Sequence, residues 1–105
     1  MKILVVRPYE SPTVAIVETL ADMQEIVGGY IQVIYPFDEP VALVCNEEGR
    51  LRNLDVNITV PKYGTIFGTF FICGLDGDDF ASLSDEKIKR FSDWCIRLRR
   101  PIYEL

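Results

Sequence analysis

The chain has 105 residues, of which 49% are hydrophobic and 26% are charged, and it carries a net charge of −5 with no histidine. This size and composition predict one domain over residues 1–105 with an ordinary hydrophobic core. No apolar run approaches the roughly 20 residues of a membrane helix, and the start is too short in apolar residues for a signal peptide, so we expect a cytoplasmic protein that does not enter the membrane.

The first elements are short and well marked by turn residues. Residues 2–7 form a Val- and Ile-rich run, which is typical of a strand buried on both faces, and residues 13–18 are expected to return as its hairpin partner. Thr19 is placed to cap a helix over about 19–28. The only Gly-Gly pair, at 28 and 29, can end this helix in the left-handed conformation.

The middle of the chain is expected to be mostly strand. Residues 30–35 and 41–45 fit two strands joined by a proline-containing turn, and residues 65–73 fit a longer one. The stretch 50–57 is ambiguous, because its leucines could form one short helical turn over the core.

The last part contains a hairpin signal and the clearest helical pattern. Asp76-Gly77 favours a tight turn into a short strand at 80–83. Ser84 is a good N-cap for a helix over about 84–100, whose apolar residues recur every three or four positions. The predicted fold class is α+β: a mostly antiparallel sheet of about 5–7 strands with two helices packed on one face.

The residues that usually carry catalysis are missing or badly spaced. Without histidine, a Ser or Cys nucleophile lacks its usual base. The two glycine motifs that bind phosphate groups, the P-loop and GxGxxG, are both absent from the sequence. The acidic turn from Asp76 departs from a calcium loop at three positions. Cys45, Cys73 and Cys95 lack the spacing of a zinc site and are expected to be buried thiols. We therefore expect no enzyme activity, no cofactor and no metal.

The charges are unevenly placed, since residues 1–83 are acidic overall and residues 84–105 are basic overall. The acidic body disfavours binding to nucleic acid. The basic end of the last helix can be a solvated face that stabilises the helix dipole, or it can bind a partner. If a partner binds there, the candidate contact residues are Trp94, Arg97, Arg99, Arg100 and Tyr103.

Several blocks resemble a family of small proteins of bacteriophages and bacterial mobile elements that is known only as a domain of unknown function. The matching blocks are residues 2–6 with Pro8, 23–31 (MQEIVGGYI), 44–49, 68–72, and 79–80 with 82–86. Residues 50–64 match least, because Leu54-Asp55-Val56-Asn57 stands where family members often have Leu-Pro-x-Asn. The resemblance implies a cytoplasmic accessory protein without an assigned activity, and it supplies no catalytic residues.

Two classes of function remain, with a weaker third. The leading hypothesis is a non-catalytic protein-interaction module that acts on a host or phage protein. The alternative is a small-molecule or nucleotide-binding domain with a pocket between sheet and helices. Aromatic residues available to line such a pocket are Tyr30, Tyr35, Tyr63, Phe70 and Trp94. The third is weak nucleic-acid binding through the last helix. The sequence leaves the oligomeric state open.

Overall fold

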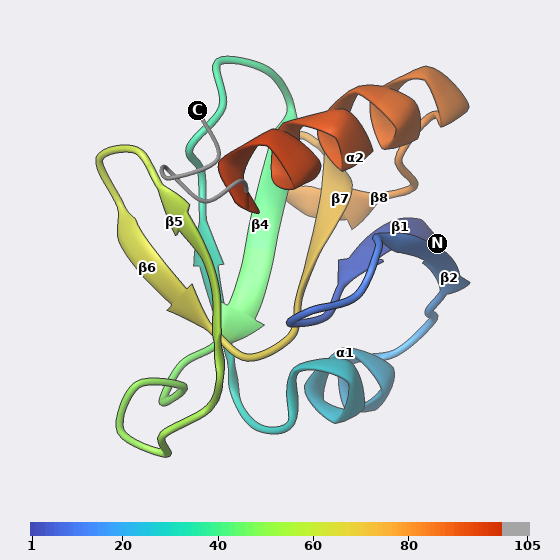
Figure 1. The fold of residues 1–105 in the computed structure, drawn as a ribbon. Helices are drawn as coiled ribbons and strands as arrows, with labels where there is room; N and C mark the ends of the chain where they lie inside the picture. Colours follow the sequence, from blue (N-terminus) through green and yellow to red (C-terminus); the bar gives the residue numbers. More distant parts are fainter. Residues whose placement is uncertain (100–105) are drawn as a thin grey trace.

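The computed structural model describes residues 1–99, which form two helices and eight strands (Figure 1). In chain order these are β1 (Lys2–Val6), β2 (Thr13–Ile16), α1 (Leu20–Val27), β3 (Ile31–Ile34), β4 (Val41–Asn46), β5 (Val56–Val60), β6 (Gly64–Phe67), β7 (Phe70–Asp76), β8 (Asp79–Ala81) and α2 (Asp85–Arg99). The main sheet has six strands in the order β2-β1-β7-β4-β3, with β8 paired to β7, and all its pairings are antiparallel. Strands β5 and β6 pair separately. The predicted α+β class is confirmed.

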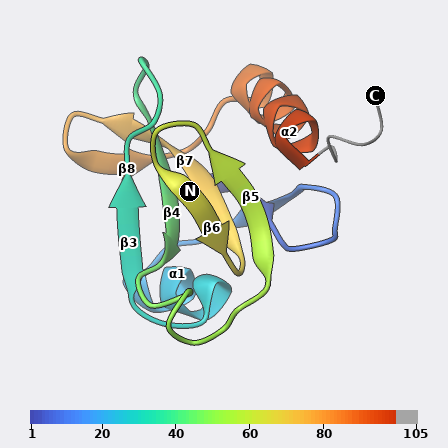
Figure 2. The ribbon, with the colours of Figure 1, turned by 60° about the vertical axis from the view of Figure 1, so that its left-hand side comes forward.

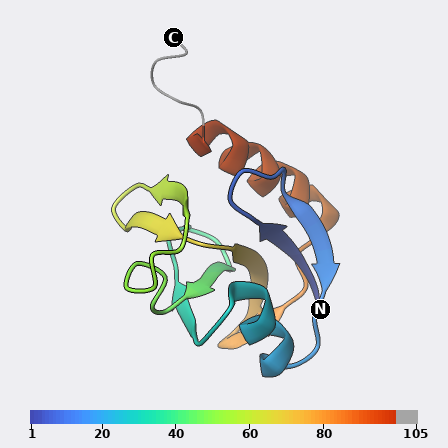
Figure 3. The same ribbon diagram turned by 60° about the horizontal axis from the view of Figure 1, so that its bottom comes forward.

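The central strands are buried on both faces, and different elements cover each face. One core cluster contains Leu4, Ile72 and Phe91 and lies under α2, while a second contains Ile3, Phe71 and Val27 and lies against α1. The two helices therefore lie on opposite faces, as Figures 1 and 3 show. The expectation that both pack on one face was wrong. A single covered face could not have buried the continuous apolar runs of β1, β4 and β7.

The boundaries of the helices follow from local sequence signals. Thr19 and Asp22 form a complete capping box at the start of α1. Gly28 ends the helix with φ of 80°, in the left-handed region that glycine adopts without steric cost. At α2, the Ser84 hydroxyl accepts a hydrogen bond from the Lys87 N–H at 3.3 Å. These caps were predicted from the sequence.

The predicted strand at 65–73 is divided in two by a glycine. Strand β6 ends at Phe67 and β7 begins at Phe70, with Gly68 at φ of 82° between them. A Cβ on Gly68 would lie 2.7 Å from Cδ1 of Leu54, so both the backbone angle and the packing require glycine here. The sequence hides this break, because the phenylalanines of β6 and β7 stand close on both sides of it and read as one apolar run.

The predicted helical turn near residue 50 is present only in part. The Arg52 N–H donates to the Glu48 carbonyl at 2.9 Å in the α-helical pattern, and the Asn53 N–H donates to the Arg50 carbonyl at 3.2 Å in the 3-10 pattern. Leu51 is nevertheless 83% exposed, so this turn does not cover the core. The chain continues instead into β5, whose hairpin with β6 lies in front of β4 in Figure 2. Ile58, Val60 and Ile66 of this hairpin enter the core under α2.

Candidate interaction site

The aromatic residue predicted as a partner anchor, Trp94, packs against the body of the protein. Its ring centroid lies 5.1 Å from that of Phe37 and 6.3 Å from that of Phe91, both with edge-on geometry. Phe37 belongs to the turn between β3 and β4, so this cluster fixes α2 to that turn. Trp94 is half-buried, whereas Arg97 is exposed on the solvent side of α2.

Arg99, a second predicted contact residue, is directed inward. Its guanidinium donates to the backbone carbonyl groups of Arg7 and Glu10 and, at 2.7 Å, to the side-chain oxygen of Asn57. Asn57 in turn donates to the carbonyl groups of Val6 and Gly68, each at 2.9 Å. Arg99 therefore joins α2 to the loop between β1 and β2 and to the β5–β6 hairpin. Arg100 and Tyr103 lie outside the described residues.

A groove of about 480 Å³ lies on the α2 face of the sheet, between β3–β4 and the β5–β6 hairpin; we call it the β3–β6 groove. Its volume is in the usual range of ligand sites. Gln32, Ile34 and Cys45 of β3 and β4 form its floor. The turn at Glu47–Arg50 closes one end, and Tyr63 closes the other.

One wall of the groove is the edge of a strand. Gly64, Thr65, Ile66 and Phe67, which are all the residues of β6, line it. Side chains of successive residues in a strand point to opposite faces of the sheet. Because four successive residues of β6 line the groove, the groove meets this strand along its edge and not on one face. β6 pairs with β5 on its other edge. Within residues 1–99 the groove edge has no pairing strand, and it offers backbone donors and acceptors to a ligand.

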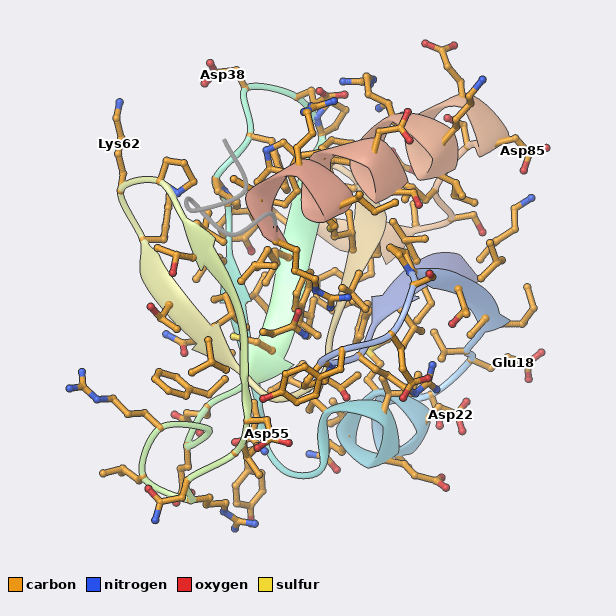
Figure 4. The ribbon with its side chains drawn as sticks, in the orientation of Figure 1. Glu18, Asp22, Asp38, Asp55, Lys62 and Asp85 are labelled. Atoms are coloured by element: carbon orange, nitrogen blue, oxygen red, sulfur yellow. The ribbon has the colours of Figure 1, made fainter. Side chains whose placement is uncertain are left out.

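Tyr63 lines one end of the groove, and two further exposed tyrosines flank the neighbouring strand β3. Tyr30 and Tyr35, at the two ends of β3, are 66% and 57% exposed, and Tyr63 is 50% exposed. The Tyr63 hydroxyl donates to the Tyr35 carbonyl at 3.0 Å and so connects the hairpin to β3. Beyond this end, Lys62 and Asp38 project outward from the hairpin tip and from the β3–β4 turn (Figure 4). Tyrosine supplies large contact area at low entropic cost, which is why it is enriched in binding surfaces.

The opposite end of the groove carries charge. Glu47 and Arg50 are both exposed there, and neither forms an ion pair within residues 1–99. Tyr63 is among the aromatic residues that the sequence offers for a pocket, whereas Gln32 and Phe67 carry no such signal. The groove could not be predicted because the sequence indicates one strand over 65–73, whereas the structure has β6 in a hairpin with β5 and β7 in the main sheet.

The cysteines have the properties of core side chains. Burial raises the pKa of Cys73 and of Cys95 to about 12 and also raises the pKa of Cys45, because a thiolate is poorly solvated in an apolar environment. All three thiols are free. Among residues 1–99, no group of three or more His, Cys, Asp or Glu side chains is arranged to hold a metal ion.

The comparisons with known proteins give a family. Residues 1–96 match the family model described as Domain of unknown function (DUF3846). The chain belongs to this family. The match spans every element from β1 through most of α2, so the DUF3846 domain includes the β3–β6 groove. No curated protein and no solved structure matches the DUF3846 chain. In the part that the structure describes, neither helix has the length and apolar character to cross a membrane.

Proposed function

We propose that this DUF3846 protein is a non-catalytic interaction module and that the β3–β6 groove binds an extended segment of a partner protein. The single observation that carries the proposal is the open edge of β6, which lines the groove with four consecutive residues. An extended peptide can add to such an edge as a further strand, with its backbone bonded to the edge and its side chains in the flanking surfaces.

The chemistry of the groove supports a peptide as the ligand. Ile34 and Phe67 offer apolar surface for a side chain, and the Gln32 amide can bond to a peptide backbone. Tyr63 at one end and Arg50 at the other are residue types enriched at protein-binding hot spots. The buried thiols and the absence of histidine support a binding role over a catalytic one.

The biological setting that we propose follows from the resemblance to small phage and mobile-element proteins. In that setting the protein acts in the cytoplasm as an accessory factor, and its partner is a host or phage protein. The net charge of −5 supports a protein partner over nucleic acid, because it repels phosphate backbones.

A photoreactive amino acid at Gln32 tests the proposal directly. Gln32 is exposed on the groove floor, and Glu25 on α1 is a control that is also exposed but lies on the other face of the sheet. In a bacterial lysate the Gln32 variant should crosslink to a protein that the Glu25 variant does not capture. Adding Tyr63→Ala should weaken that adduct, because the mutation removes part of the groove. Equal adducts from both positions, or none from Gln32, would contradict the proposal.

The groove also supports the alternative, a small-molecule site, because its volume of about 480 Å³ would hold a drug-sized compound. The structure places this hollow between the sheet and the hairpin, and not between sheet and helices. A nucleotide or metabolite that binds only the folded state raises the melting temperature. A shift that Tyr63→Ala abolishes, together with no crosslinked protein at Gln32, would favour this alternative.

A further inference from the structure

Strand β2 is an open edge of the main sheet that carries no charge. It pairs with β1 on one side, and within residues 1–99 nothing pairs with its other side. The seven residues from Ser11 to Val17 include no charged side chain. Natural proteins usually protect exposed edges with charges, bulges or a covering element. β2 is short and follows Pro12, but it carries no charge and, within the part of the chain that the structure describes, no covering element, so its edge is available to pair with a strand of another chain.

Two apolar side chains stand exposed on this strand. Val14 is 52% and Ile16 is 67% exposed. Val14 lies opposite Leu4 in the antiparallel register, and opposed residues share a face of the sheet. Because Leu4 belongs to the core under α2, Val14 and Ile16 also point to the α2 face.

One side of helix α2 lies along the hairpin of β1 and β2, on the face to which Val14 and Ile16 point. Asp85 pairs with Lys2 of β1, and Arg99 binds the loop that follows β1, so α2 runs along the hairpin of β1 and β2 (Figure 3). Ile96 lies three turns from Asp85 on the same side of the helix and is 46% exposed. Val14, Ile16 and Ile96 are thus exposed apolar side chains on the α2 face beside the open edge, and we call them the apolar strip.

A second copy of the chain fits this edge in one antiparallel register that pairs apolar residues and avoids opposed charges. In a continuous sheet built by a two-fold axis, opposed residues must share a face. Among the registers that meet this condition, two place Val14 opposite an apolar residue of β2, which is either its own copy or Ile16 of the second chain. The first register places Glu10 opposite Glu18, which repel each other. The second places no charged pair in opposition, and Ala15 lies on the axis. Glu18 points outward at the end of β2 in Figure 4.

We propose that two copies of this chain associate through β2 in antiparallel pairing, with Ala15 on the two-fold axis and Val14 opposite Ile16 of the second copy. The pairing joins two six-stranded sheets into one and covers the apolar strip of each chain. The interface lies on the strand opposite to β3 in the order of the sheet, so it leaves the β3–β6 groove of each copy open.

Sedimentation of the full chain tests the association. We expect the mass to rise with concentration from 12.0 kDa to twice that value. Ile16→Lys should raise the dissociation constant by about tenfold or more, because each ammonium group would be buried in the apolar strip. Leu51→Lys is the control at a site that is 83% exposed. A monomer at every concentration, or a dimer that Ile16→Lys leaves unchanged, would overturn the proposal.

Cysteine crosslinking tests the register independently of stability. Ala15→Cys should form an intermolecular disulfide under mild oxidation, since its copy lies directly across the axis at a distance suited to the bond. Thr13→Cys is on the same strand and face, but its copy is four residues away, so it should not crosslink. The three native thiols are buried and do not compete. Crosslinking of Thr13→Cys in preference to Ala15→Cys would refute the pairing.

Discussion

Arg99 donates a hydrogen bond of 2.7 Å to the side chain of Asn57 and so joins the end of α2 to β5, the first strand of the β5–β6 hairpin. The same guanidinium binds the carbonyl groups of Arg7 and Glu10. A residue that belongs by sequence to a basic, solvated helix end thus connects three segments that are far apart in the chain. The charged guanidinium of Arg99 therefore binds oxygen atoms of the protein itself and is not displayed to a partner.

We expect Arg99→Ala to lower the free energy of unfolding by about 2 kcal/mol, because three oxygen acceptors lose a charged donor. Arg97→Ala, on the exposed side of the same helix, should change it by less than about 0.5 kcal/mol. Arg99→Lys should restore only part of the loss, since an ammonium group lacks the planar fork of donors. Urea unfolding of the three variants measures these differences. Equal effects at positions 97 and 99 would contradict this role.

Gly28 is expected to be needed for its backbone conformation and not for space. Its φ is 80°, and a Cβ there would meet no atom within 4 Å. Gly28→Ala should therefore cost about 1–2 kcal/mol of stability from the left-handed conformation. Gly28→Asn should cost less, because asparagine tolerates this region better. Thermal unfolding compares the two variants, and an equal loss in both would point to a different cause.

The buried thiols predict a loss of stability at alkaline pH. Because burial raises the pKa of Cys73 and Cys95 from the ordinary 9.0 to about 12, the folded protein keeps protons that the unfolded chain releases. Their contribution to stability is complete below pH 9 and is lost progressively as the pH rises toward 12. Double replacement of both cysteines by alanine should flatten this dependence in urea titrations at pH 8 to 10.5. An unchanged slope would show that other groups dominate.

Much of the local structure was predictable because it depends on neighbouring residues. The capping box at Thr19, the left-handed Gly28 and the Asp76-Gly77 turn all act within a few positions of the chain. The placement of α1 and α2 on opposite faces depends on contacts between distant segments. The sequence does indicate this placement of the helices, because a continuous apolar run such as residues 2–7 is typical of a strand covered on both faces.

The candidate site was harder to predict than the fold. The groove requires that the chain leave the hairpin at Gly68 and enter the main sheet at Phe70. A glycine within an apolar run does not by itself indicate that a strand ends there. The need for glycine at position 68 becomes clear only from the Leu54 side chain that packs against it. The inward orientation of Arg99 likewise depends on Asn57, which is 42 positions away in sequence.

The connection at Gly68 and Thr69 separates the strand pairing of the β5–β6 hairpin from that of the main sheet. β7 is held between β1 and β4 in the main sheet, whereas the hairpin β5–β6 makes no strand pairing with that sheet within the described residues. The hairpin is held by side-chain packing, by the Asn57 bonds and by the bond from the Tyr63 hydroxyl to the Tyr35 carbonyl, so its separation from the sheet would break no ladder of backbone bonds. We therefore expect the hairpin wall of the groove to open more readily than the main sheet, so that the width available to a bound segment can change while the sheet stays folded.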